Sequence, residues 1–333
     1  MRRQLVVLLA LVFSVATANC HEVKSEEPLQ RLAFGSCNKD DKPQPVWKGI
    51  LAAKPDLWVW LGDIVYARAG DLRDLEQRYH SLKEHADYKA LRAQTRVLGV
   101  YDDNDFMTGS GKRESQRLLL DFLDEPPESA RRQQAGAYAS YTFGPAGKRV
   151  KLILLDERFH REVQGGDMLG VEQWTWLEQQ LTASTADVHL VGSGIQVIPT
   201  EHGYDKWADF VGARRRLLDL VAKTQPRNLI FLSGDRHLGE ISRLSEPRFP
   251  QPIYDITSSG MTHHAKDWWF RKNFSQEPNQ YRVGTNFLGL NFGIVEFNWE
   301  ASPAVATLQI RDATGAVKIE ERITLAPAAP ASP

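Results

Sequence analysis

Apolar runs of strand length recur along the chain, and they end in polar residues. The clearest cover residues 31–37, 57–63, 96–103, 150–158, 188–198 and 228–237. Helical patterns lie between several of them, over Leu72–Leu91, Ser115–Leu123 and Gly170–Leu181. In the last, Trp174, Leu177 and Leu181 recur at the spacing of one helix face. Continuous apolar strands alternating with helices are typical of an α/β core that is covered on both faces.

The pattern changes after residue 290, where three apolar segments are separated only by turn residues. They cover residues 292–299, 304–312 and 317–325 and predict a closing antiparallel set of strands. The chain contains no internal repeat and no long low-complexity linker. We therefore expect one layered α/β domain over residues 31–325, after a flexible segment at 19–30 and before a disordered tail at 326–333.

The N-terminal stretch differs in kind from the rest of the chain. Two arginines precede a short apolar run, and Ala16-Thr17-Ala18 supplies small residues at cleavage positions. This pattern predicts a signal peptide over residues 1–18 and an exported protein, periplasmic or extracellular, with no transmembrane anchor once the signal is removed. A membrane-anchoring helix is the alternative, although the run is short for a bilayer. Lipid attachment at Cys20 is another, which the preceding Thr17-Ala18-Asn19 fits poorly.

Composition narrows the choice of function. The 333 residues are 42% hydrophobic and 25% charged, with a formal net charge of −1. That is ample material for a large core, and near-neutral charge gives no electrostatic reason to expect binding to nucleic acid or to an anionic membrane surface. The chain has two cysteines, Cys20 and Cys37. A buried, inert thiol is the ordinary interpretation of a residue such as Cys37.

Most of the polar residues that end the apolar runs have side chains that can bind a metal ion. They are Cys37, Asp63, Asp102, Asp103, Asn104, Asp105, Asp156, Gln196, Asp235 and His237. Ligands of open α/β folds gather at the carboxyl ends of strands. A single aspartate there is ordinary, because aspartate favours turns and helix caps. Potential ligands at almost every strand end indicate a metal site.

The same stretches resemble the PhoD-like alkaline phosphatases, a branch of the metallophosphoesterase superfamily. The resemblance includes "FGSCN", "PDLWVWLGDIVYA", "VLGVYDDND", "LSGDRHLGE" and "DITSSGMT", which follow one another in the family's order. It implies a four-layer α/β/β/α sandwich with two facing mixed sheets. It also implies a metal-dependent phosphoric ester hydrolase that acts on small phosphate mono- or diesters, and we expect a monomer.

The resemblance also implies a ligand set for two metal ions. Asp63 would bridge them, Cys37, Tyr66 and His237 would complete the first site, and Asp103 and Asp235 would belong to the second. Two close ions lower the pKa of a water, which yields the attacking hydroxide, and hold the phosphate oxygens. Tyr66 is otherwise an aromatic packing residue, and Asp102 could face away.

The donor types indicate which metals to expect. Thiolate suits iron or zinc better than magnesium, whereas oxygen donors suit calcium, manganese or magnesium. A hard trivalent ion would also stabilise the phenolate of Tyr66, whose ordinary pKa is about 10. The resemblance implies Fe³⁺ and Ca²⁺, with Mn²⁺, Mg²⁺ or Zn²⁺ as alternatives for the divalent ion.

Arg158 and Arg236 are candidates for binding phosphate, because a guanidinium offers a planar fork that matches its oxygens. A structural salt bridge is the alternative for each. Gln196 could donate an oxygen to the second site or satisfy a strand-to-loop corner. With Asp63 and Asn104, the two arginines are our predicted catalytic residues.

Asn104 stands where the family usually has a histidine, associated with protonating the leaving oxygen. Asparagine cannot give up a proton near neutral pH, and general acid catalysis is worth about 10²–10⁴-fold. His202 or the pair His263-His264 could substitute. A second hypothesis follows, which is a catalytically weakened relative that binds phosphorylated ligands or metal.

Overall fold

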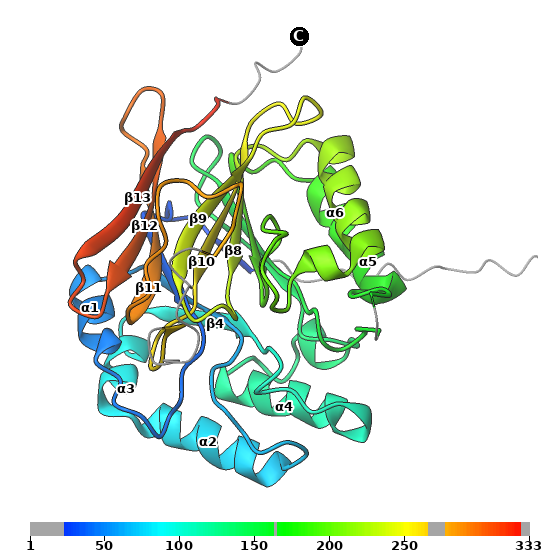
Figure 1. The fold of residues 1–333 in the computed structure, drawn as a ribbon, viewed down its shortest axis with the longest axis vertical. Helices are drawn as coiled ribbons and strands as arrows, with labels where there is room; N and C mark the ends of the chain where they lie inside the picture. Colours follow the sequence, from blue (N-terminus) through cyan, green and yellow to red (C-terminus); the bar gives the residue numbers. More distant parts are fainter. Residues whose placement is uncertain (1–22, 163–164, 266–276, 328–333) are drawn as a thin grey trace, which may run out of the picture.

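The computed structural model describes residues 23–162, 165–265 and 277–327. The predicted signal peptide, Cys20 and residues 328–333 of the predicted tail lie outside these ranges. In the described part, two mixed sheets face each other with helices on their outer sides (Figure 1). The predicted four-layer sandwich is therefore confirmed.

The first sheet combines the N-terminal parallel strands with the closing antiparallel set. Its strand order is β13-β12-β11-β2-β3-β4. The parallel strands are β2 (Arg31–Gly35), β3 (Leu57–Leu61) and β4 (Arg96–Val100). The antiparallel strands are β11 (Asn291–Asn298), β12 (Val305–Asp312) and β13 (Val317–Thr324). Each of these strands lies within or next to a segment expected from the sequence.

The second sheet has the order β1-β5-β6-β7-β8-β10-β9. Its strands are β1 (Val23–Ser25), β5 (Ala139–Phe143), β6 (Val150–Leu154), β7 (Val188–Ser193), β8 (Leu229–Ser233), β9 (Gly239–Leu244) and β10 (Ile253–Ser258). β6, β7, β8 and β10 run parallel. Within the segment at 19–30 that we expect to be flexible, Val23–Ser25 form β1 and pair with β5.

Helices cover the outer face of each sheet. α1 (Val46–Ala53), α2 (Leu72–Glu84), α3 (Ala86–Arg92) and α4 (Lys112–Phe122) pack on the first sheet, and α5 (Gly170–Thr182) and α6 (Val211–Thr224) pack on the second. Short 3₁₀ turns span Gly109–Gly111, Ala130–Arg132 and Trp207–Asp209. The helix expected over Leu72–Leu91 is broken at His85, whose φ of −60° and ψ of 126° are extended.

The strands alternate between two cores, which fixes the layers. In β3, Leu57, Val59 and Leu61 face the core between the sheets. Trp58 and Trp60 point to the opposite side, into the helices of the first sheet. Because both faces of this strand are buried, its sequence reads as a continuous apolar run.

Glycines let the strand ends of the two sheets approach each other closely. A Cβ at Gly234, after β8, would lie 2.7 Å from the carbonyl oxygen of Leu61 and 2.9 Å from that of Gly194. A Cβ at Gly62, where φ is +82°, would lie 2.2 Å from the Cβ of Asp102. The polar residues after β2, β3, β4 and β8 are thus brought to one place.

Candidate metal centre

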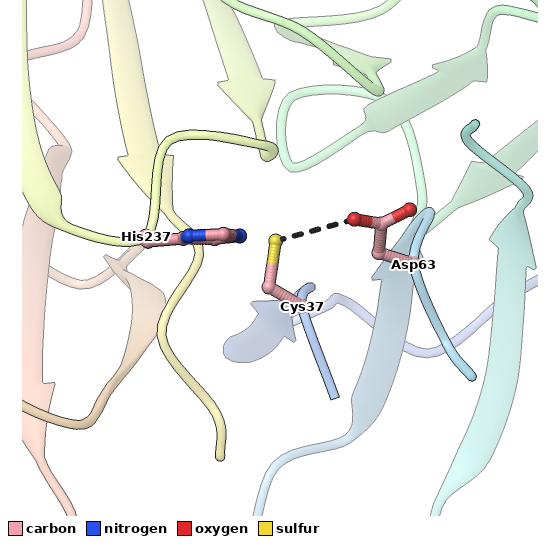
Figure 2. Close-up of side chains that lie close together, drawn as sticks. All are labelled: Cys37, Asp63 and His237. Atoms are coloured by element: carbon pink, nitrogen blue, oxygen red, sulfur yellow. Dashed lines mark hydrogen bonds between the residues drawn. The ribbon is translucent and has the colours of Figure 1, made fainter. Parts of the chain in front are cut away.

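The strand-end residues form two groups of potential ligands that share one carboxylate. The ligand atoms of Cys37, Asp63 and His237 lie within 4.8 Å of one another, and so do those of Asp63, Asp103 and Asp235. Figure 2 shows the first group, in which the three side chains converge from separate loops. Asp63 belongs to both groups, as a bridging carboxylate would.

The backbone around these side chains is unusual. Cys37, Asp63, Asp235 and His237 have φ values of 60°, 49°, 68° and 55°. Positive φ is uncommon in residues other than glycine and clusters at functional sites, where surrounding structure compensates for its cost. Each strand therefore ends in a sharp turn that redirects its chain and aims a donor atom at the common centre.

Asp63 is the most heavily engaged side chain of the cluster. Its Oδ2 accepts hydrogen bonds from the Tyr66 hydroxyl at 2.9 Å and from the Asn104 amide at 3.0 Å, and the Cys37 thiol lies 3.6 Å from it. Its Oδ1 accepts from the backbone N–H of Asn104 at 3.1 Å. The Tyr66 hydroxyl is also 3.4 Å from Nε2 of His237. Tyr66 therefore belongs to the first group rather than to the packing core alone.

Asp105 holds two of the loops together, a role that the sequence did not reveal. Its Oδ1 accepts from the backbone N–H of Asp102 at 2.7 Å and of Asp63 at 3.2 Å. Its Oδ2 accepts from the N–H of Ile64 at 3.0 Å and from the hydroxyl of Tyr79 at 3.2 Å. The acidic run after β4 was visible in the sequence, but which of its carboxylates turn inward was not.

Burial and mutual repulsion disfavour the charged forms of the cluster. Burial, followed by the charges of Asp103 and Asp102, raises the pKa of Asp63 well above its ordinary value. Burial and the same two charges raise the pKa of Asp235 to about 8. Burial, then the charge of Asp63, likewise raises the pKa of the Cys37 thiol and of the Tyr66 phenol.

The donor set fits a pair of metal ions. Several acidic groups lie around one centre, and bound cations would favour their deprotonated forms. The first group offers sulfur, imidazole, phenol and carboxylate. The second offers carboxylates, with Asp103 exposed and Asp235 partly buried. These are donor sets for a softer and a harder ion, respectively.

The two candidate arginines are placed differently. Arg158 lies in a buried ion pair with Asp102, and its Nη2 is 3.2 Å from Asp205. This arrangement favours the salt-bridge alternative for Arg158, and Asp102 belongs to neither ligand group. Arg236 lines the cavity over the cluster, although its Nη2 also donates to both oxygens of Glu277, at 2.7 and 2.6 Å. Arg236 is therefore the better placed of the two for binding phosphate.

The remaining polar candidates differ in whether they reach the site. Gln196 donates to Glu240 and Thr257, both at 2.7 Å, which favours the corner alternative. His202 is buried beside Arg236, and burial, followed by the charges of Arg236 and Lys206, strongly lowers its pKa. His263 does reach the site, with its Nε2 3.2 Å from Nε2 of His237. Burial, then the charge of His237, lowers the pKa of His263 to about 3, so its imidazole is neutral near pH 7.

The cluster forms the floor of a cavity of about 690 Å³. Its lining includes residues that the sequence did not single out, namely Lys39, Lys42, Tyr204, Asp205, Thr262 and Ala265. Lys39 and Lys42 follow the "GSCN" motif directly and could have been suspected from that position. Tyr204 and Asp205 lie in the segment after β7, where no pattern in the sequence marks them.

Comparisons with known proteins identify a family and a fold. A family model described as "PhoD-like phosphatase" matches residues 32–265. Alkaline phosphatase D of Bacillus subtilis (strain 168) is 21% identical over 281 residues, which are 65% of this chain and 47% of that protein. The match thus spans about half the length of the curated relative.

Solved structures show the same fold at low sequence identity. A structure of PhoD aligns with a TM-score of 0.66 and 17% identity over 90% of this chain and 69% of that one. The purple acid phosphatase PPD1 from yellow lupin gives 0.61 and 13%, over 90% and 54%. GAP50, the anchor in the inner membrane complex of Plasmodium, gives 0.59 and 12%, over 90% of each.

Within residues 23–162, 165–265 and 277–327, no helix combines the length and the apolar character needed to cross a membrane.

Proposed function

The chain belongs to the PhoD-like phosphatase family, and from this premise we propose that it is a metal-dependent phosphoesterase whose site is the Asp63 cluster. The observation that carries the proposal is the sharing of Asp63 by two groups of potential ligands. Two bound ions would supply Lewis acidity, which lowers the pKa of a water molecule and neutralises charge on the phosphate oxygens.

The proposed roles of the chain's own residues follow from their donor atoms. Asp63 would bridge the two ions. Cys37, Tyr66 and His237 would hold the first, for which iron as Fe³⁺ suits the sulfur and phenol donors. Asp103 and Asp235 would hold the second, for which Ca²⁺ suits carboxylate oxygens, with Mn²⁺, Mg²⁺ or Zn²⁺ as the other candidates.

Arg236 and Asn104 would act on the phosphate rather than on the metals alone. Arg236 lines the cavity and its buried Nε has no hydrogen-bond partner within the described residues. A phosphate oxygen would satisfy that donor. Asn104 can donate a hydrogen bond near the leaving oxygen but cannot protonate it.

The substrate class, the oligomeric state and the cellular location are also parts of this proposal. The substrate would be a small phosphate mono- or diester, bound by a monomeric enzyme. Residues 1–18 support export to the periplasm or the cell exterior. Nothing in the net charge of −1 favours nucleic acid.

One observation favours the second candidate, a weakened relative that binds phosphorylated ligands or metal with little turnover. The side-chain amide of Asn104 donates to Asp63 and to Asp103, both at 3.0 Å. It occupies the place of the family's acid, and the pKa of His263 is lowered rather than raised. The imidazole of His263, which lines the cavity, is therefore neutral near pH 7 in the metal-free protein.

A direct assay separates the two candidates. The purified protein is stripped with a chelator, reloaded with Fe³⁺ and Ca²⁺, and given 4-nitrophenyl phosphate and bis-(4-nitrophenyl) phosphate. We expect turnover that disappears with the chelator and returns with metal. Failure to turn over either ester, with both metals bound by elemental analysis, would favour the weakened relative.

A further inference from the structure

The cavity has more room than a phosphate group needs. Its volume of about 690 Å³ lies in the range of pockets that enclose a whole organic ligand. The organic part of a substrate would therefore contact the walls of this cavity, and the charges on those walls would select among substrates.

Two lysines give one wall a positive charge. Lys39 and Lys42 both line the cavity with the proposed metal ligands. The Lys39 ammonium lies 4.9 Å from the centroid of the Tyr66 ring. The backbone N–H of Lys39 donates to the Thr262 hydroxyl at 2.6 Å, which fixes the loop after Cys37 against the segment that carries His263. The position of this wall relative to the cluster is therefore set by the fold.

These two ammonium groups differ from the other cations near the site. Arg158 is paired with Asp102 and Asp205, and Arg236 with Glu277. Within the described ranges, by contrast, neither Lys39 nor Lys42 forms an ion pair with a carboxylate. They are thus available to an anionic group of a ligand in the cavity.

Resting on the proposed function, we propose that Lys39 and Lys42 form a second anion-binding subsite of this cavity. The substrate is then a phosphate ester whose organic part carries a further anionic group, either a second phosphate or a carboxylate. The scissile phosphate lies at the Asp63 cluster and the second anion lies against the lysine wall. Positive charge at the metal-loaded cluster and at the lysine wall would attract the two anionic groups of such a substrate, and would so orient it as well as bind it.

Competitive inhibition of 4-nitrophenyl phosphate hydrolysis tests this subsite with defined ligands. Fructose 1,6-bisphosphate is compared with fructose 6-phosphate for the second phosphate, and 3-phosphoglycerate with glycerol 3-phosphate for the carboxylate. We expect the ligand with the additional anion to bind about tenfold or more tightly, the order that a charge-assisted hydrogen bond gives. The pair with the larger ratio identifies the anion that the wall prefers.

Variants assign the preference to the lysines. The ratio in question is the inhibition constant of the ligand with one anionic group divided by that of its partner with two. The double variant Lys39→Ala/Lys42→Ala should bring this ratio close to one, and Lys39→Arg/Lys42→Arg should keep it. Lys48→Ala, which removes one positive charge from an exposed position of α1 outside the cavity lining, should leave the ratio unchanged. Metal content is measured in every variant, so that a loss of metal is not mistaken for a loss of the subsite.

Two results would overturn the subsite. One is equal inhibition by both members of each ligand pair in the parent protein, and the other is a ratio that survives in Lys39→Ala/Lys42→Ala at full metal content. If the parent does not hydrolyse 4-nitrophenyl phosphate at all, the proposed function fails by itself. Calorimetric binding of the same four ligands to the metal-loaded protein then tests the subsite independently.

Discussion

Asn104 shows how one residue can keep a site assembled and yet change its chemistry. Its backbone N–H and its side-chain amide both donate to Asp63, and the amide also donates to Asp103. The residue thus joins the shared carboxylate to the second ligand group. It does so without a proton that it could release near neutral pH.

Asn104→His tests what the missing acid costs. Nitrophenolate leaves with little help from a proton, whereas an alkoxide needs one. We expect the parent protein to cleave aryl phosphates faster than alkyl phosphates, and Asn104→His to improve the alkyl class more. A gain of about tenfold would correspond to roughly 1.4 kcal/mol of transition-state stabilisation.

The comparison uses kcat/KM for both substrate classes in both proteins at matched metal loading. Matched loading matters because a histidine cannot reproduce both hydrogen bonds of the Asn104 amide. Equal rates for the two classes in the parent would mean that another acid is already at work. The explanation based on Asn104 would then be wrong.

Motifs in the sequence indicated which residues could bind metal, but not the direction in which every side chain points. The strand-end pattern and the family resemblance together led to Cys37, Asp63, Tyr66, Asp103, Asp235 and His237, and the structure brings these six side chains to one centre. Arg158 could not be assigned in the same way. Its guanidinium pairs with Asp102 and with Asp205, and Asp205 is distant in sequence and belongs to a loop without a pattern.

At the scale of the elements, the site depends on how closely the strand ends approach each other. Gly234 follows β8 and precedes Asp235, and a Cβ there would meet two backbone oxygens and the hydroxyl of Ser36 at 2.6–2.9 Å. Gly194, after β7, would place a Cβ 2.7 Å from Oδ1 of Asp102. These contacts leave no space for a methyl group between the two sheets.

Gly234→Ala should therefore separate the strand ends. We expect a loss of about 1–3 kcal/mol in the free energy of unfolding, the usual cost of overpacking. Because Asp235 is the next residue, the affinity for the second metal should also fall, by about tenfold or more. Urea unfolding and metal titration measure the two effects.

Gly212→Ala is the matched control for this substitution. Gly212 lies in α6, and a Cβ there would meet nothing within 4 Å. Alanine should be neutral or stabilise the helix by up to about 1 kcal/mol. A Gly234→Ala protein as stable as the Gly212→Ala protein, with intact metal affinity, would contradict the close approach of the two sheets.

The helices and strands also show which elements the pattern of hydrophobic residues could predict and which it could not. Strands β3 and β6 were recognisable because burial on both faces makes their runs continuous. The break at His85 was not, because helix-forming residues such as Lys83, Glu84 and Ala86 continue across it and no glycine or proline marks it. Strand β1 consists of three residues and depends on its pairing with β5, a contact that local sequence does not encode.

For the whole molecule, the cluster makes stability depend on metal and on pH. Burial, then the charges of Asp102 and Asp103, raises the pKa of Asp235 to about 8, whereas an unfolded aspartate titrates near about 4. Between these values the folded, metal-free protein keeps a proton that the unfolded chain has lost. The stabilising contribution of Asp235 to the free energy of unfolding is therefore fully present below about pH 4 and is lost as the pH rises through about 8.

Asp235→Asn isolates this contribution from that of other groups. Without metal, the variant should gain stability over the parent as the pH rises from about 5 to about 8, because the amide does not ionise. With metal, the parent should be the more stable protein, because it binds the ion more tightly. Denaturant midpoints at both pH values, with chelator and with metal, measure the difference. A difference that does not change with pH or metal would contradict the proposed electrostatics.

Metal stoichiometry of the parent and of Asp63→Ala tests the central claim most directly, which is that one carboxylate is shared by two ions. For the parent protein we predict two ions per chain, one of them iron with a visible charge-transfer absorption from its thiolate or phenolate ligand. Asp63→Ala should lose both ions and the colour, and its activity should fall by several orders of magnitude. An Asp63→Ala protein that keeps both ions and the parent's turnover, or a colourless, iron-free parent that is fully active, would contradict the proposed centre.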